Sequence, residues 1–170
     1  MLLLAASSSG CGYALAGRGS FLPEYIRTVG IPPVQNATTF FRADQVLTEK
    51  IREEFIGRGK YNVQSTPAGA QAVLNGTISA ISVSPVGFTA QQLASRYVVS
   101  VTMNVTFTDA TTNQVLWSNG ALSFSSEYDL TTRSNAALEG AGFLDQEGPA
   151  FERIASDVAR SVVSAILEAF

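Results

Sequence analysis

The sequence predicts an α+β domain in two layers: a mixed sheet of four to five strands with two helices on one face. Three patterns lead to this prediction. Residues 25–65 carry a helical period between two short strand candidates, residues 72–128 hold three long strand candidates, and an amphipathic helix follows residue 149. The resulting order is β-α-β, then a β-meander, then α. A chain of 170 residues is expected to form one such domain.

The first predicted strand covers residues 25–31, a short apolar-rich segment. Pro32 and Pro33 stop it, because proline cannot donate a hydrogen bond to a sheet and restricts the residue before it. Residues 34–43 are then expected to form a loop.

A helical face begins at residue 44. Leu47, Ile51 and Phe55 recur every four residues, which is typical of one side of a helix. We expect the helix to run to about residue 57 and a second short strand to cover residues 61–65. If the two flanking strands are parallel, this crossover unit is right-handed.

Three longer strands are predicted at residues 72–84, 96–109 and 114–128. The middle strand alternates strictly between apolar and polar residues, so one set faces a core and the other faces away from it. The apolar set is Val99, Val101, Met103, Val105 and Phe107, and the polar set is Ser100, Thr102, Asn104, Thr106 and Thr108.

The flanking strands show slips in this alternation. Residues 109–113 form a polar turn, so the strand that follows returns antiparallel. A slip of one residue flips the buried face. We place a bulge at Asn119-Gly120 and a second slip between Ala80 and Ile81.

The final helix opens at Pro149, because proline is tolerated in the first turn. Its apolar residues follow at three- and four-residue spacing: Phe151, Ile154, Ala155, Val158, Val162, Ile166 and Leu167. This stripe predicts a helix that covers the sheet. The alternative interpretation is a stripe that binds a partner or a membrane surface.

The composition excludes several kinds of chemistry. The chain has no histidine, which removes Ser-His-Asp and Cys-His catalysis and zinc sites built from His and Cys. The chain contains neither the P-loop motif GxxxxGK[ST] nor the dinucleotide-binding motif GxGxxG. Charged residues make up 15% and the net charge is −3, so nucleic acid is not an expected partner. We therefore expect no enzyme, no cofactor and no metal, and no later apolar run predicts a membrane-spanning helix.

The only cysteine, Cys11, lies in GCGY directly after the short apolar run MLLLAASSSG. Bacterial lipoproteins are cut just before a cysteine that then takes the lipid. Cys11 is either lipid-modified after such a cut, a small buried residue, or an exposed thiol. No basic residue precedes Arg18, so the start has the form of a truncated signal. We expect residues 1–24 to comprise this truncated lipoprotein signal and a tether, and residues 25–170 to form the domain.

The polar face of the strand at residues 96–109 has an unusual composition for a solvated surface. It carries hydroxyl and amide side chains between Ser100 and Thr108 and no charge. A solvated strand usually carries Lys and Glu, which protect it from aggregation. Either this is an ordinary solvated face, or it lies against another polar wall or hydrogen-bonds sugars and phosphates.

Several stretches line up, in order, with a known family. They are GCGY at 10–13, Leu22-Pro23, Ile31-Pro32, LTEKIREEFIGRGKYNV at 47–63, VLNGTIS at 73–79, VLWSN at 115–119 and ARSVVSAIL at 159–167. Together they resemble the LPS-assembly lipoprotein family, the LptE-like proteins of Gram-negative outer membranes. The resemblance covers nearly the whole chain from Cys11 onward.

This resemblance implies an outer-membrane lipoprotein on the periplasmic side, anchored through a lipid on Cys11. It implies a partner, the LptD-like β-barrel of LPS assembly, which the protein plugs and helps to assemble while lipopolysaccharide is delivered to the outer leaflet. It also implies lipopolysaccharide binding by basic residues in loops at one end of the sheet. The loop residues of this kind are Arg96 and Arg133. An arginine suits lipid A phosphates because its planar fork binds them bidentately.

A second resemblance leaves an alternative function open. The stretch IPPVQNATTFFRADQVLTEKIREEF at residues 31–55 also looks like periplasmic lipoproteins that regulate a cell-wall synthase or form a secretion pore. Those proteins share the anchor but not the barrel. The protein that co-purifies with the chain separates the two possibilities.

Overall fold

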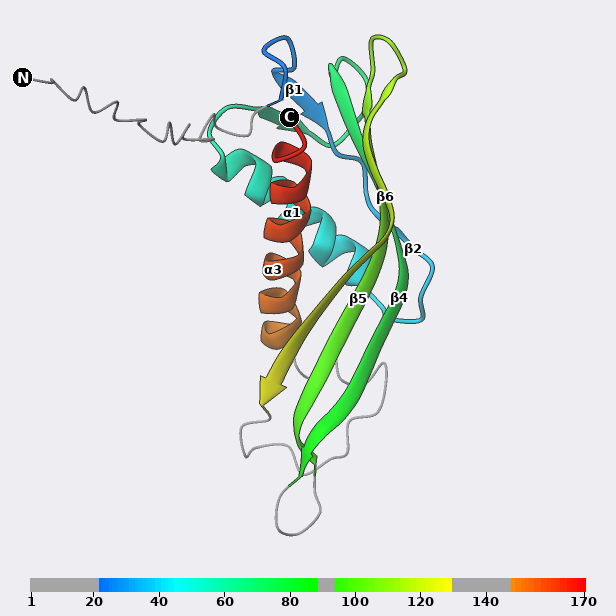
Figure 1. The fold of residues 1–170 in the computed structure, drawn as a ribbon, viewed down its shortest axis with the longest axis vertical. Coiled ribbons are helices and arrows are strands. Elements are labelled where there is room, and N and C mark those ends of the chain that lie inside the picture. The colour runs from blue at the N-terminus through cyan, green and yellow to red at the C-terminus, as the bar shows by residue number, and fades with distance from the viewer. Residues whose placement is uncertain (1–21, 89–93, 130–147) are drawn as a thin grey trace, which may run out of the picture.

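The computed structural model of the protein describes residues 22–88, 94–129 and 148–170. Its elements, in chain order, are β1 (Thr28–Gly30), β2 (Gln35–Asn36), α1 (Ala43–Gly57), β3 (Asn62–Gln64), β4 (Ala72–Phe88), β5 (Ala94–Asp109), β6 (Val115–Asp129) and α3 (Gly148–Leu167). Figure 1 shows α1 and α3 on the same side of the sheet. The predicted α+β fold with two layers is confirmed.

The sheet is mixed, with the strand order β3-β1-β4-β5-β6 and with β2 paired to β4 outside this path. Strand β1 is parallel to both β3 and β4, and the β4–β5 and β5–β6 pairs are antiparallel. The unit β1-α1-β3 is therefore the predicted crossover between parallel strands, and β4 to β6 are the predicted meander.

The core lies between the sheet and the two helices. On α1, the side chains of Leu47, Ile51 and Phe55 are fully buried, as their spacing predicts. The apolar stripe of α3 is also buried, which confirms that this helix covers the sheet. Burying one large apolar side chain contributes about 1.5–3 kcal/mol, so these two stripes hold the layers together.

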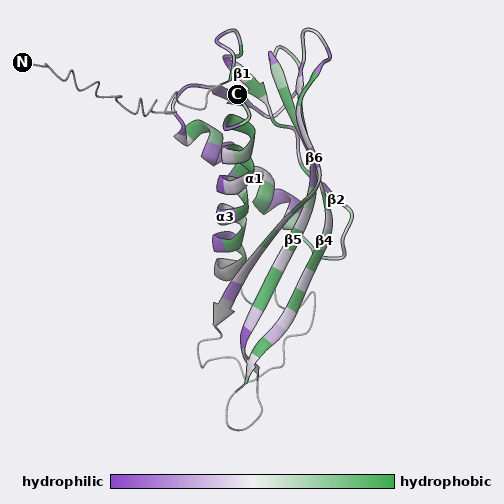
Figure 2. Ribbon diagram, viewed as in Figure 1, coloured by the Kyte–Doolittle hydropathy of each residue, from purple (hydrophilic) through white to green (hydrophobic). Residues whose placement is uncertain are grey.

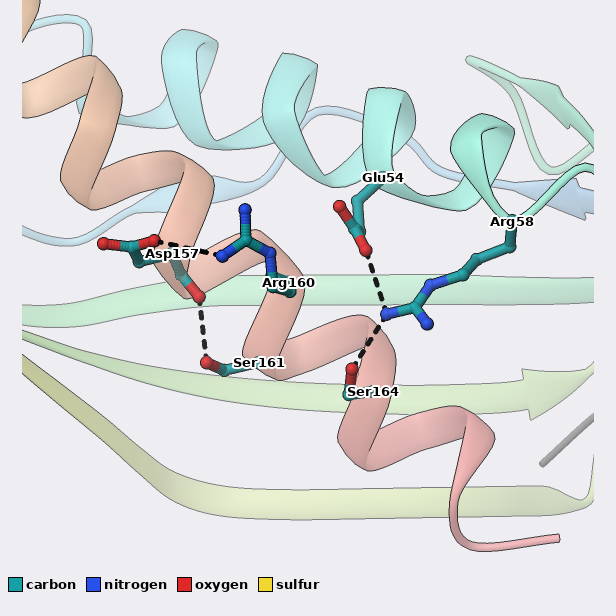
Figure 3. Close-up of polar contacts among 6 residues, drawn as sticks. All are labelled: Glu54, Arg58, Asp157, Arg160, Ser161 and Ser164. Atoms are coloured by element: carbon teal, nitrogen blue, oxygen red, sulfur yellow. Dashed lines mark hydrogen bonds and ion pairs between the residues drawn. The ribbon is translucent and has the colours of Figure 1, made fainter. Parts of the chain in front are cut away.

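A polar bridge adds to the contact between the helices, as Figure 3 shows. The Arg58 guanidinium, just after α1, lies 2.9 Å from the carboxylate of Glu54 and donates a 2.8 Å hydrogen bond to the hydroxyl of Ser164 on α3. The bridge joins the end of α1 to the last turn of α3.

Strands β4 and β5 form a long hairpin that extends well beyond the helices (Figure 1). The alternation predicted for β5 is confirmed, because Val99, Val101 and Met103 are fully buried. In β6 the register shifts where Met103 pairs with Leu122 and Val105 with Asn119, which confirms the predicted bulge.

The slip in β4 lies slightly earlier than predicted. Ile78 pairs with Met103 and Ala80 with Thr102, so Ser79 is the extra residue of the bulge. Here the alternation of small residues such as Ser79 and Ala80 locates the bulge only approximately, since neither has a strong preference for the core.

Strand β2 falls within the segment expected to be a loop. Gln35 and Asn36 pair in parallel with Thr77 and Ile78 of β4. A two-residue strand is too short to show a period, and its pairing depends on a partner far away in the sequence. Strand β1 is also shorter than residues 25–31, because the chain turns before it through the Ile26 N–H to Pro23 C=O hydrogen bond of 2.9 Å.

Candidate functional site

The side of the long hairpin that faces away from the helices carries hydroxyl and amide groups from three strands. Its residues, which we call the hydroxyl face, are Asn75, Thr77 and Ser82 on β4 with the small Ala80 between them, Ser100, Thr102, Asn104 and Thr106 on β5, and Ser118, Ser123 and Ser125 on β6. They share one face because directly paired residues of an antiparallel sheet point to the same side. Each is partly or fully exposed.

Hydrogen bonds join the hydroxyls across the strands. The Oγ atoms of Ser100 and Ser125 lie 2.7 Å apart. The Thr102 hydroxyl donates a 3.5 Å hydrogen bond to the Oγ atom of Ser123. Ser79 in the β4 bulge donates a 3.1 Å hydrogen bond to the carbonyl oxygen of Thr102. These contacts hold the side chains upright while leaving acceptor capacity on each hydroxyl.

The hydroxyl face contains no charged residue. Strand β4 carries none along its length, and the charges of β5 and β6 lie near the strand ends. Figure 2 agrees: the β4–β5 hairpin is mostly green or pale, and strongly hydrophilic colour is confined to short stretches. Such a surface forms hydrogen bonds with a neutral partner without removing a charge from water.

The surface at the end of the hairpin farthest from β1 carries charged and apolar side chains in place of hydroxyls. Arg96 lies on the same outward side and its Nη1 is 3.7 Å from the carboxylate of Glu127, with both side chains at least half exposed. Across the hairpin, Gly87 pairs with Arg96, and the neighbouring Val86 and Phe88 are 50% and 63% exposed. A guanidinium beside exposed apolar side chains is an amphipathic end, able to meet both a phosphate and an acyl chain.

Of the predicted site residues, the structure places Arg96 only, and this residue lies within strand β5 rather than in a loop. Cys11 and Arg133 lie outside the described residues, so lipidation of Cys11 and a shared site of the two arginines stay predictions. Sequence reasoning missed the exposed Val86 and Phe88 beside Arg96. Their signal was weak, because exposed apolar residues in a strand look like core residues until the pairing is known.

A second polar cluster, also missed from the sequence, closes the opposite end of the sheet. The buried carboxylate of Asp109 accepts a 2.7 Å hydrogen bond from the Tyr25 hydroxyl, and 2.7 and 3.2 Å hydrogen bonds from the backbone N–H groups of Thr111 and Thr112. The Tyr25 hydrogen bond, with help from these backbone donors, lowers the pKa of Asp109 to about 2. An acid this strong stays ionised at neutral pH and is no general acid. Its role is to fix the turn.

In the three stretches that the structure covers, no group of acidic, histidine or cysteine side chains could hold a metal ion. Within the same stretches, neither helix is long and apolar enough to cross a bilayer.

The fold and its surface place the chain among the small α+β domains with a long exposed hairpin. The family model LptE, described as lipopolysaccharide-assembly, matches residues 26–166. The chain belongs to this family, in agreement with the resemblance found in its sequence, and the family is one of assembly proteins rather than of enzymes. No curated protein matches the chain.

Solved structures share the fold at low sequence identity. A hypothetical protein from Chlamydia trachomatis has a TM-score of 0.56 at 14% identity, over 83% of this chain and 96% of that one. The dodecamer of a leucine-to-methionine variant of PelC from Paraburkholderia phytofirmans has a TM-score of 0.51 at 18% identity, over 87% of this chain and 93% of that one. A minor lipoprotein from Acinetobacter baumannii has a TM-score of 0.51 at 10% identity, over 84% and 91%.

Proposed function

We propose that the protein is an outer-membrane lipoprotein that sits inside the LPS-translocating β-barrel, assists its assembly and helps to deliver lipopolysaccharide to the outer leaflet. Membership of the lipopolysaccharide-assembly family supports the process. The single observation that carries the plugging role is the uncharged hydroxyl face of β4, β5 and β6.

The physical argument concerns desolvation. The lumen of a transmembrane barrel is polar. A plug must exchange water for contacts with that wall, and burying an unpaired charge costs far more than burying a hydroxyl that finds a partner. Serine and threonine hydroxyls both donate and accept, so they adapt to either kind of group on the wall. The hydroxyl face therefore suits contact with a polar protein wall.

The far end of the hairpin is the proposed lipopolysaccharide contact. Arg96 supplies a planar cation for phosphate, and Val86 and Phe88 beside it supply apolar surface. Arg133 is proposed as a second cation on the grounds of its place in the sequence. This end lies at the opposite extreme of the sheet from β1, near which the described chain begins (Figure 1).

The anchor is proposed at Cys11, with residues 1–24 as signal and tether and residues 25–170 as the domain. Ten residues separate Cys11 from Leu22, whose side chain is buried. Fully extended, ten residues reach about 35 Å at most, which keeps the domain close to the membrane that holds the lipid. The proposed location is the periplasmic side of the outer membrane.

The test is a detergent pull-down of the tagged chain from a Gram-negative host, with mass spectrometry of the proteins that accompany it and of Cys11. The proposal expects a large outer-membrane β-barrel in near one-to-one amount and an acylated Cys11. Recovery of a cell-wall synthase, or of the chain alone as a ring, would reject the barrel function.

Lysine substitutions test the hydroxyl face within the same experiment. Thr102→Lys with Thr106→Lys adds two charges to the face at partly exposed positions, and Gln45→Lys with Thr112→Lys adds the same charge at exposed positions elsewhere. We expect the first pair to lose the barrel and the second to keep it. Equal recovery with both pairs would remove the hydroxyl face from the interface.

A further inference from the structure

A cleft runs between the edge of the sheet and α3. Its volume is about 130 Å³, and its apolar walls come from Phe124 on β6 and from Ile154 and Val158 on α3. Asp157 and Ser161 of α3 line its polar side. Figure 3 shows these two side chains on the same side of the helix, where Ser161 Oγ donates a 2.9 Å hydrogen bond to the Asp157 carbonyl oxygen. The cleft is open and shaped as a groove between a strand and a helix.

Residues 124–126 of β6 form one wall of this groove, and β6 is the last strand of the sheet. Among the described residues no strand pairs with its outer edge. From Val115 to Ser126 the edge carries no charged residue and no proline. Native proteins usually protect such an edge with lysine, proline or a covering segment, because its free N–H and C=O groups pair readily with another strand.

We propose that the groove between β6 and α3 binds an extended segment of the barrel partner, which adds to the sheet as a strand. Only an extended backbone satisfies a row of free N–H and C=O groups, and addition of a strand beside a helix is a recurring mode of peptide recognition. One apolar side chain of the segment would fill the space between Phe124, Ile154 and Val158. The inference rests on the proposed function for the source of the segment.

The absence of charge on the β6 edge limits the residue types that the bound segment can carry. The β6 edge is neutral over twelve residues, and the carboxylate of Asp157 is already 3.6 Å from Arg160. A charged residue of the segment would lose water without gaining a partner on the strand. The segment is therefore uncharged where it faces β6, with apolar residues toward α3 and hydroxyl or amide residues on the other side, continuing the hydroxyl face.

A second copy of this chain fits the groove less well. Antiparallel pairing of two β6 edges around a two-fold axis would join the sheets with their helices on the same side. Each copy would then bring its own α3 to the groove that the other copy needs. A strand without a helix of its own meets no such obstacle.

The experiment measures amide hydrogen exchange of residues 115–126 in the free chain and in the purified barrel complex, resolved to single residues. We expect alternate residues of β6 to exchange roughly tenfold or more slowly in the complex, because only alternate amides of an edge strand point outward. Ser161→Phe fills the groove and should abolish this protection while the complex persists. Ser156→Phe is the matched control, since it changes the same residue type on a different face of α3.

Each outcome decides between the possibilities. A complex that forms without added protection of β6 overturns the inference and leaves the proposed function standing. Protection that rises with the concentration of the free chain assigns the groove to a second copy, and protection already present in the dilute free chain assigns it to the chain itself. Failure to form the complex removes the proposed function and this inference with it.

Discussion

The hydroxyl of Tyr25 donates a 2.7 Å hydrogen bond to Oδ2 of Asp109, between residues 84 positions apart in the sequence. The contact ties the segment that leads into β1 to the turn between β5 and β6. It thereby fixes where the N-terminal segment joins the sheet. The same hydrogen bond lowers the pKa of Asp109 and raises that of Tyr25, because it favours the carboxylate and the protonated phenol.

This pair predicts an acid-sensitive contribution to stability. The pKa of Asp109 falls from the ordinary 3.8 to about 2 in the folded protein. The stabilisation is therefore complete above about pH 4 and is lost as the pH falls toward 2. Asp109→Asn should lower the melting temperature at pH 7 and flatten its dependence on pH between 4 and 2. Thermal melts across that range check this, and an unchanged slope would contradict it.

The buried hydroxyl of Thr48 is expected to stabilise the folded protein. Thr48 Oγ1 accepts a 2.9 Å hydrogen bond from the Val34 N–H, at a site where both residues are buried. Thr48→Val keeps the shape and removes the acceptor, so it should lower the free energy of unfolding by about 1–3 kcal/mol. Thr48→Ser retains the hydroxyl and should cost about 1 kcal/mol for the lost methyl group. Urea denaturation measures both variants, and an unchanged free energy of unfolding in Thr48→Val would mean that the hydroxyl does not contribute to stability.

The backbone near Thr66 packs so closely against Gly30 that a larger residue is expected to destabilise the protein. A Cβ atom added there would lie 2.7 Å from the Thr66 carbonyl oxygen and 3.2 Å from Ala70 Cβ. Gly30→Ala should therefore destabilise the protein by about 1–3 kcal/mol through forced shifts in β1. Gly57→Ala is the control, because an added Cβ at Gly57 meets nothing within 4 Å. That variant should be neutral or slightly stabilising in the same unfolding assay.

Arg96 and Arg133 are expected to contribute to the affinity for lipopolysaccharide. Replacing both with alanine should weaken the binding of purified lipopolysaccharide about tenfold, which corresponds to roughly 1.4 kcal/mol. The loss should be smaller at high salt, since the contact is exposed and screened. Arg160→Ala, at an exposed arginine of α3, serves as the control. Unchanged affinity of the double variant would remove both arginines from the proposed site.

Much of the fold could be predicted because its elements carry strong local periods. The alternation at residues 99–107 and the four-residue spacing of Leu47, Ile51 and Phe55 specify a strand and a helix without reference to the rest of the chain. The bulge at Asn119-Gly120 was visible because the alternation changes face there. Strand β2 was not visible, because two residues carry no period and need β4 to pair with.

The candidate site divides in the same way. The absence of charge between Ser100 and Thr108 is a property of the sequence and predicted one strip of the hydroxyl face. Its width was decided by register: only the pairing of Ser100 with Ser82 on one side and with Ser125 on the other brings three strands into one surface.

The sequence by itself determined the types of the long elements, the buried side of β5 and the family to which the chain belongs. The tertiary structure alone decided the Tyr25–Asp109 contact, the position of the exposed Val86 and Phe88 across the hairpin from Arg96, and the groove between β6 and α3. The physical reason is the distance along the chain that separates the residues involved. A period arises within a few residues of chain, whereas a hydrogen bond across 84 positions or a groove at a sheet edge exists only after distant elements have packed.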